Sequence, residues 1–354
     1  MATSRLVDVA KATGYSVNTV SLALRGSDRV APATRAAIEE AASQLAYMPN
    51  RVARSLVEQR TRTIGVVLTD IMNPSLTSVA QRLERELAEQ DLSMLLVTTE
   101  QSIERERRAL DVLASQQVDG ILVFPVHHSA VGHIRAVSEL RRPVVLLAGH
   151  PGPMDVDLVA MDNVAGAQRA VEHLIELGHR RIGLVNGGVR VGNSEKFQGY
   201  AAALAAHDLP REDDWTIAPL GFGFEDGYVA AKQLLERVPD LTAVLASTDE
   251  LAIGVLAWCR DRGIEVPEHL SVVGYDDTPA AAFAHPKLTS VAYDAGLVAR
   301  SAVERLIQRI EEAVSGERKP PERTVYLPEL VIRDSSSTPR GGANPAAPHQ
   351  GGTT

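Results

Sequence analysis

The sequence predicts two structural classes in one chain, an all-α segment at the N-terminus and a larger α/β body with two lobes. Three observations predict this. The first 50 residues hold three short segments with helical apolar spacing. From residue 63 onward, continuous apolar runs alternate with helical segments, which is typical of parallel sheets covered on both faces. About seven such units span about 270 residues, which favours two lobes over one.

The N-terminal segment reads as a helix-turn-helix pattern. The first predicted helix covers residues 4–12, and Gly14 permits the tight turn that follows it. Ser16 can cap the second helix, which ends near Gly26, and a third helix runs from Pro32 to about Leu45. The candidate core residues are Leu6, Val9, Ala10, Val20, Ala23, Leu24, Ala36, Ile38, Ala42 and Leu45.

The second helix presents small and mostly uncharged side chains on its outer face, namely Val17, Asn18, Ser21 and Leu22. From the residues alone, an ordinary surface helix explains this face well. Residues 1–60 carry eight basic and five acidic side chains, a net charge of +3, whereas the rest of the chain carries −12. This asymmetry hints at a small head that binds a polyanion, but a solvated surface explains it equally well.

The body is predicted from its apolar runs. The predicted strands are residues 64–68, 93–97, 120–124, 143–148, 181–185, 242–246 and 270–275. The predicted helices are residues 75–90, 102–117, 164–177, 194–207, 225–237, 249–262 and 294–314. Ligands of such sheets bind at the carboxyl ends of the strands, so a cleft between two lobes would bring those loops face to face.

Composition excludes several classes of protein. Cys259 is the only cysteine, so no internal disulfide forms, which fits a reducing compartment. The N-terminus has no apolar core of a signal peptide, and no apolar run approaches the length of a membrane span. We therefore expect a cytoplasmic protein. Residues 335–354 are rich in Ser, Gly, Pro and Ala, and we expect a disordered tail there.

An enzyme is the main alternative from sequence alone. The glycine runs at residues 187–192 and 221–227 lack the spacing of a dinucleotide-binding loop, and no phosphate-binding loop or G-x-S-x-G motif is present. His127 and His128 are adjacent, so on a strand they face opposite ways and do not share a metal. We expect no enzyme activity, no cofactor and no metal. A solute-binding protein is the other alternative, and it has no use for residues 1–60.

Six motifs together resemble the lactose-repressor (LacI/GalR) family of transcriptional regulators. They are RLVDVAKATGYSVNTVSLAL, LAYMPNRVARSL, RTIGVVLTDIMNP, MDNVAGAQRAVEHLIELGHRRIGLV, LSVVGYDD and PKLTSV, in that order between residue 5 and about residue 334. The resemblance implies a helix-turn-helix headpiece, a hinge helix and a two-lobed effector domain like the type I periplasmic binding proteins. It further implies a homodimer that binds a palindromic DNA operator under the control of a small effector, and we expect a repressor.

The resemblance divides the chain into domains. It implies a headpiece over residues 1–60 with a hinge helix at about 50–58, and an effector domain over 61–334. The N-terminal lobe would take residues 61–161 and 291–322, and the C-terminal lobe residues 162–290 and 323–334. No leucine-heptad extension follows Arg333, so we expect a dimer without a tetramerisation helix.

In this reading the second helix lies in the major groove, where Asn18 can pair with adenine and Val17 can contact thymine methyl groups. Many family members carry arginine where this chain has Leu22, so the preferred operator base is expected to differ. In the hinge, Leu56 matches the residue that wedges into the minor groove. The DNA-contacting residues implied are Ser16, Val17, Asn18, Ser21, Leu22, Tyr47, Asn50, Arg51, Ala53 and Leu56.

The effector-binding residues implied lie at strand ends in the two lobes. They are Asp70, Asn73, His150, Lys196, Phe222, Thr248 and Asp276. Carboxylate, amide and cationic groups in one cleft suit a polyhydroxylated ligand, so a sugar or sugar derivative is favoured. Lys196 and Thr248 stand where sugar-binding relatives often have arginine and asparagine, which keeps a nucleobase, an amino acid or another metabolite open. The sequence also leaves open whether the effector releases or promotes DNA binding.

Overall fold

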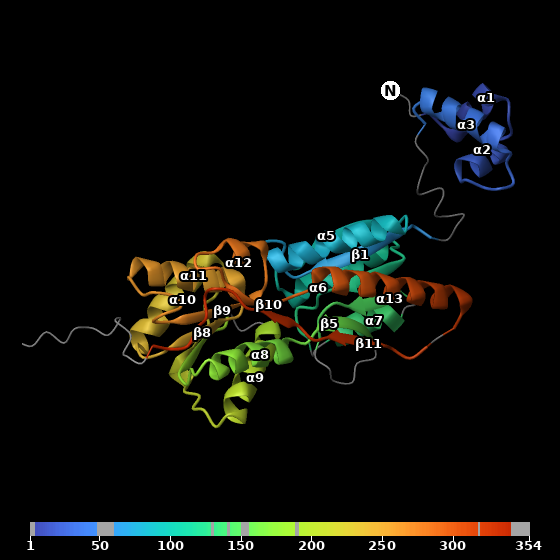
Figure 1. Ribbon diagram of the computed structural model, residues 1–354. Helices are drawn as coiled ribbons and strands as arrows, with labels where there is room; N and C mark the ends of the chain where they lie inside the picture. The colour runs from blue at the N-terminus through green and yellow to red at the C-terminus, as the bar shows by residue number, and fades with distance from the viewer. Residues whose placement is uncertain are drawn as a thin grey trace, which may run out of the picture. The chain divides into compact units, whose positions relative to one another are not determined.

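The computed structural model describes residues 4–47, 60–128, 131–139, 142–149, 156–187, 191–317 and 319–340. Its contacts divide the chain into two compact units, Met1–Arg62 and Thr63–Thr354. We refer to the first unit as the headpiece and to the second as the body. Each unit is described by itself, and both are drawn in Figure 1.

The headpiece is built from three helices, α1 (Leu6–Thr13), α2 (Val17–Leu24) and α3 (Pro32–Gln44). Gly14 has a φ of +73° after α1, as the predicted turn requires. The small core contains Val9, Ala10, Val20, Ala23, Val30, Ile38 and Ala42. Ala36 was expected in this core but is exposed. Helical spacing alone placed it inward, whereas Ile38 and Ala42 of α3 are the residues that face α1 and α2.

The body contains two six-stranded sheets, which confirms the predicted α/β class with two lobes. The first sheet has the order β11-β5-β4-β3-β1-β2, and the second has the order β12-β10-β9-β8-β6-β7. The first comprises β1 (Thr63–Leu68), β2 (Ser93–Thr98), β3 (Gly120–Val123), β4 (Val144–Leu146), β5 (Asp157–Met161) and β11 (Arg323–Tyr326). The second comprises β6 (Ile182–Val185), β7 (Thr216–Ile217), β8 (Ala243–Ala246), β9 (Ser271–Asp276), β10 (Thr289–Ala292) and β12 (Glu329–Val331).

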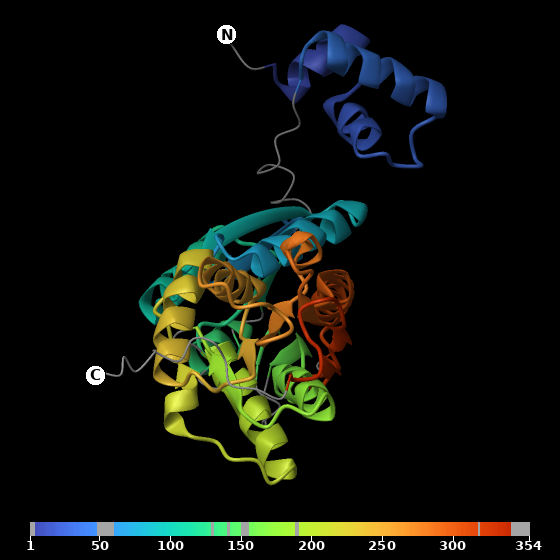
Figure 2. The same ribbon diagram turned by 60° about the vertical axis from the view of Figure 1, so that its left-hand side comes forward.

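Helices cover both faces of each sheet, which explains why the strands are apolar throughout rather than alternating (Figure 1). The lobe around the first sheet, here the N lobe, holds α5 (Pro74–Glu89), α6 (Ile103–Ser115), α7 (Gly132–Glu139) and α13 (Ala295–Ser315). The lobe around the second sheet, here the C lobe, holds α8 (Asn163–Glu176), α9 (Val191–Ala206), η1 (Asp213–Trp215), α10 (Phe224–Arg237), α11 (Asp249–Asp261) and α12 (Pro279–Phe283). The turned view also shows the helices outside the strands in both lobes (Figure 2).

The chain crosses between the lobes at points that differ from the expected lobe boundaries. Strand β11 pairs in parallel with β5 and belongs to the N lobe, although residues 323–334 were expected in the C lobe. Strand β10 pairs with β9 in the C lobe, so the crossing follows residue 292 rather than preceding 291. These two strands are short and lack a long apolar run, so the sequence pattern did not reveal them, nor did it reveal β5 or β7.

The C-terminal segment corrects the expected tail. Ser335 is completely buried, and its hydroxyl accepts a hydrogen bond from the Thr289 backbone N–H at 2.8 Å. The Val272 backbone N–H donates to the Ser335 carbonyl at 2.7 Å, which extends the C-lobe sheet pairing past its last strand. Residues 335–340 are therefore part of the C lobe, because backbone and hydroxyl groups hold them without a large apolar surface. Residues 341–354 lie outside the described residues.

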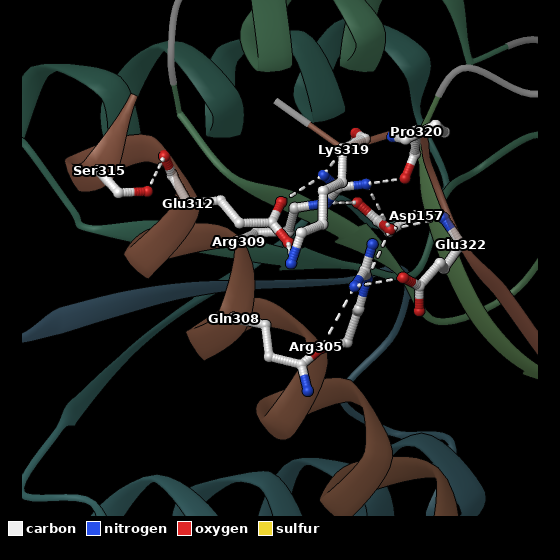
Figure 3. A network of polar contacts seen from close by, with 9 residues as sticks. All are labelled: Asp157, Arg305, Gln308, Arg309, Glu312, Ser315, Lys319, Pro320 and Glu322. Carbon is white, nitrogen blue, oxygen red and sulfur yellow. Dashed lines mark hydrogen bonds and ion pairs between the residues drawn. The ribbon is translucent and has the colours of Figure 1, made fainter. Parts of the chain in front are cut away.

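The buried carboxylate of Asp157 links helix α13 to the segment just before strand β11 (Figure 3). Asp157, at the start of β5, accepts hydrogen bonds from Arg305 Nε at 2.7 Å and Arg309 Nε at 2.6 Å. Its Oδ1 also accepts from the backbone N–H of Glu322 at 2.8 Å, just before β11. Arg309 further donates to the Pro320 carbonyl at 2.5 Å. This cluster, which we call the Asp157 clamp, fixes the chain that returns from α13 to β11 beside β5.

Two further features concern membrane-spanning helices and metal sites. Within the described ranges, no helix is long and apolar enough to cross a membrane. In the same part of the chain, no group of three or more His, Cys, Asp or Glu side chains is arranged to hold a metal ion.

Candidate functional site

The first candidate site is the exposed N-terminal half of α2 in the headpiece. Ser16 caps the helix as predicted, since its hydroxyl accepts a hydrogen bond from the Thr19 backbone N–H at 3.0 Å. Val17 and Asn18 are exposed at the first turn, and Val17 is 42% exposed although it is apolar. Ser21 is partly exposed one turn further on. The outward-facing side chains at this end of α2 are therefore small, so a binding partner can approach the helix closely.

Two of the expected DNA-contacting residues also have a structural role in the headpiece. Leu22 and Tyr47 are partly buried and pack against the headpiece core. The side chain of Leu22 therefore presents only part of its surface outward, which the helical spacing did not predict. Asn50, Arg51, Ala53 and Leu56 lie outside the described residues.

The second candidate site is a cavity between the two lobes of the body. It holds about 900 Å³ of space not filled by protein atoms, counting the part open to solvent. The N lobe lines it with Thr69, Asn73, Ser75, Leu76, Gln101, Phe124, Pro125, Val126, His128, Leu147, Ala148, Ala160 and Met161. The remaining lining residues are Asn163, Asn193, Lys196, Phe222, Thr248, Asp276 and Tyr293.

Lys196 and Asp276 bring opposite charges to this cavity. Lys196, on α9, is buried, donates a hydrogen bond to the Ser247 carbonyl at 2.6 Å, and lies 3.8 Å from the centre of the Tyr275 ring. Its Nζ is 3.9 Å from Asp276 Oδ1. Burial lowers the pKa of Lys196 and raises the pKa of Asp276. Both groups therefore gain from a ligand that supplies the hydrogen bonds they lost with water.

The backbone conformation of Asp276 is also unusual. Asp276 has a φ of +100°, a conformation that side-chain-bearing residues rarely adopt. Such conformations cluster at ligand sites, where the surrounding structure maintains them. Here the strain turns the chain at the carboxyl end of β9 and places the carboxylate in the cavity wall.

Asp249 supports this end of the C lobe from behind the cavity. It is completely buried at the first turn of α11, where its carboxylate accepts from the Thr278 backbone N–H at 2.6 Å and from Ser290 Oγ at 2.5 Å. Burial, together with the nearby Asp276, raises the pKa of Asp249 to about 7, although these hydrogen bonds act to lower it. Asp249 thus connects α11 to the segments after β9 and in β10.

The other expected effector residues divide into those that reach the cavity and those that do not. Asn73 lines it, although its side-chain oxygen also caps α5 by accepting from Ser75 N at 2.9 Å. Thr248 lines it and caps α11 through Leu251 N at 3.3 Å, and Phe222 lines it as well. Asp70 is corrected, because it does not line the cavity and its carboxylate accepts from Met72 N at 2.8 Å within the loop. His150 lies outside the described residues.

Sequence reasoning missed several polar lining residues, among them His128, Asn163 and Asn193. His128 follows β3, so the rule that ligands meet the carboxyl ends of strands could have found it. Asn163 follows β5, a strand that the sequence pattern did not reveal, so its position carried no signal.

Comparisons with known proteins decide the family. The model of the bacterial regulatory proteins of the lacI family matches residues 5–50, and the periplasmic binding protein-like domain matches residues 171–336. A relative named HTH-type transcriptional regulator CelR, from Thermobifida fusca, is 36% identical over 92% of this chain and 96% of its own length. The chain belongs to the lacI family of bacterial regulatory proteins.

Solved structures agree with this assignment. A transcriptional regulator CelR-cellobiose complex is 32% identical, with a TM-score of 0.70 over 94% of this chain and 100% of that chain. The fold is also that of the lac repressor dimer bound to operator and the anti-inducer ONPF, with a TM-score of 0.85 over 95% of this chain and 100% of that chain, at 24% identity. This lacI-family chain is a DNA-binding transcriptional regulator, and the relatives named here are regulators rather than enzymes.

Proposed function

We propose that this regulator represses transcription as a homodimer that binds a palindromic operator, and that a sugar or sugar derivative in the cavity of the body controls this binding. The lac repressor dimer bound to operator, whose fold this chain shares, supports the dimer. Since such an operator lies on chromosomal DNA, we place the protein in the cytoplasm.

One observation carries the choice of effector: buried Lys196 and Asp276 face the same cavity as Asn73, Asn163 and Phe222. The amides and the two charged groups provide both donors and acceptors for hydroxyl groups. Phe222 supplies an apolar face for the C–H side of a sugar ring. The similar CelR-cellobiose complex makes β-linked glucose sugars the first ligands to try.

The first experiment is a thermal-shift screen of the full chain against cellobiose, other sugars, polyols and nucleobases. A ligand of the folded body raises the melting temperature, and the stabilisation grows with the logarithm of its concentration once this exceeds Kd. A response to sugars supports the proposal, whereas a response to nucleobases alone replaces the sugar with the other ligand class. A complete absence of response to this panel contradicts a sugar effector.

The second experiment tests DNA binding. The full chain is selected against a randomised duplex pool at moderate ionic strength, with and without the ligand from the first screen. We expect a palindromic consensus, because a two-fold dimer mirrors its symmetry in the site. Asn18→Ala should lose the selected sequence and keep the ligand-induced thermal shift. If wild-type protein shows no sequence preference in either condition, the body acts as a solute-binding protein without a DNA role.

A further inference from the structure

His128 occupies a position between the two lobes of the body. It follows β3 in the N lobe, lines the cavity and is 8% exposed. Its Nδ1 lies 2.9 Å from Oε1 of Glu195, which comes from α9 in the C lobe. The preceding residue, His127, is exposed. His128 is therefore held by one lobe's loop and by the other lobe's carboxylate.

The carboxylate of Glu195 is itself held in place. Its second oxygen accepts a hydrogen bond from Asn163 Nδ2 at 2.8 Å, and Asn163 Oδ1 accepts from the Tyr275 hydroxyl at 3.2 Å. An ionised carboxylate only accepts hydrogen bonds, so Nδ1 of His128 carries the proton that is donated to Glu195. This chain of contacts fixes the orientation of the ring, and in a neutral ring it leaves Nε2 as the unprotonated nitrogen.

The loop that carries His128 is anchored from the N-lobe side as well. Glu106, which is completely buried on α6, accepts from the backbone N–H of Val126 at 2.6 Å. The other oxygen of Glu106 lies 2.5 Å from His133 Nε2 on α7. The backbone two residues before His128 is therefore fixed to the lobe interior.

We propose that His128 is an effector-contacting residue: its unprotonated Nε2 accepts a hydrogen bond from a hydroxyl or N–H group of the ligand, and Glu195 is the positioning residue. This inference rests on the cavity being the effector site. Within the described residues, the polar contact of the ring is the one that Nδ1 makes with Glu195, so a group that enters the cavity is the partner available to Nε2.

The proposal narrows the ligand class. His128 and Asp276 both line the cavity, from the N lobe and the C lobe respectively, and in this proposal Nε2 of His128 and the carboxylate of Asp276 both act as acceptors. A ligand that satisfies both needs two donor groups on opposite sides. A polyhydroxylated ring meets this requirement, and an ether in place of the hydroxyl at His128 does not, because it leaves Nε2 desolvated without a donor.

The decisive experiment is nitrogen NMR of the full chain with labelled histidine at neutral pH, without ligand. His128→Ala identifies the signal, and His127→Ala is the matched control that leaves it in place. We expect Nδ1 to carry the proton and Nε2 to show the downfield shift of an unprotonated ring nitrogen. Glu195→Ala should abolish the preference for this tautomer, which a purely structural role of Glu195 does not require. A proton on Nε2, alone or with one on Nδ1, overturns the proposal.

Calorimetry with cellobiose as the probe tests the contact itself. His128→Ala should weaken binding about tenfold, the usual net effect of one neutral hydrogen bond. His128→Gln, which places an amide oxygen near the Nε2 position, should recover part of the affinity, and His127→Ala should match wild type. Unchanged affinity in His128→Ala overturns the proposal. If cellobiose does not bind wild type, the sugar proposal fails on that ligand, and the tautomer measurement alone decides the role of His128.

Discussion

The two lobes of the body share a six-stranded sheet covered by helices, but they bury their charges in different places. In the N lobe, the buried ionic groups Asp157, Arg305 and Arg309 form the Asp157 clamp at the start of β5 (Figure 3). In the C lobe, Lys196, Asp249 and Asp276 lie in the cavity wall or directly behind it. Among the described lining residues, those from the N lobe include no Asp, Glu, Lys or Arg.

This difference assigns separate tasks to lobes of the same architecture. A buried carboxylate that accepts hydrogen bonds from two arginines and a backbone N–H holds a chain segment in one arrangement, as Asp157 does for the return to β11. Buried charges that lack full solvation or pairing favour a ligand that supplies the missing partners. The N lobe thus contributes a fixed wall, and the C lobe contributes most of the polar chemistry. The predictions below test this comparison.

The largest effect is expected from Asp157→Ala. It removes the carboxylate that Arg305 and Arg309 share and leaves them with Glu322 and Glu312 as their respective ion-pair partners, which costs up to about 3–5 kcal/mol of unfolding free energy. Chemical denaturation of the full chain measures the loss. The matched control is Asp240→Ala in the C lobe, which removes a 2.7 Å ion pair with Arg181 whose side chains are 44% and 54% exposed. This control should lose at most about 1 kcal/mol. Equal losses in the two variants would contradict the clamp.

The second effect is a pH dependence of stability that comes from Asp249. Burial raises its pKa to about 7 in the folded protein from 3.8, so the folded state binds a proton that the unfolded state has lost between these values. Stability from this group is complete below about pH 4 and falls as pH rises to about 7, by up to about 4 kcal/mol. Asp249→Asn should flatten this part of the melting-temperature curve. Asp261→Asn, at an exposed position of the same helix, should leave the slope as in wild type.

A third effect concerns the ligand rather than stability. Lys196→Met removes the cation of the cavity, and we expect effector binding to weaken by about 10- to 100-fold, the usual effect of one charge-assisted hydrogen bond. Calorimetry with the ligand found by thermal shift gives the ratio. Lys232→Met, at an exposed position of α10, is the matched control and should bind as wild type does. An unchanged Kd in Lys196→Met would place the polar recognition elsewhere.

The smallest effect is a change of base preference at one position. Leu22→Arg puts a bidentate donor on α2, and we expect the half-site to gain a guanine preference of about 1–3 kcal/mol. Selection from randomised duplexes compares the two consensus sequences. Val7→Arg adds the same charge at an exposed position of α1 and should raise affinity without changing the consensus. The same consensus for Leu22→Arg and wild type would argue against the base contact.

Much of this protein follows from local pattern. The cap at Ser16, the turn at Gly14 and the helices that alternate with apolar strands were predicted because each depends on neighbouring residues. The strands β7, β10, β11 and β12 were not, because each contains polar residues instead of a continuous apolar run. Their positions depend on partners distant in sequence, such as β5 for β11.

The candidate site divides in the same way. Residues directly after long strands, such as Asp276, were expected at the cavity and line it. Asp70 was expected there on the same argument, but its carboxylate bonds to the Met72 backbone N–H two residues away. Whether such a carboxylate bonds within its own loop or reaches a ligand depends on the geometry of the loop, which the order of residues does not specify.

By itself, the sequence determined the helix-turn-helix head, the two α/β lobes and the family, because these depend on spacing of apolar residues and on motif order. Only the tertiary structure decided which polar side chains meet. His128 and Glu195 are 67 residues apart and belong to different lobes, yet they lie 2.9 Å from each other. Hydrogen bonds act over a few ångströms, so pairing of this kind is set by how the lobes pack and not by the order of residues along the chain.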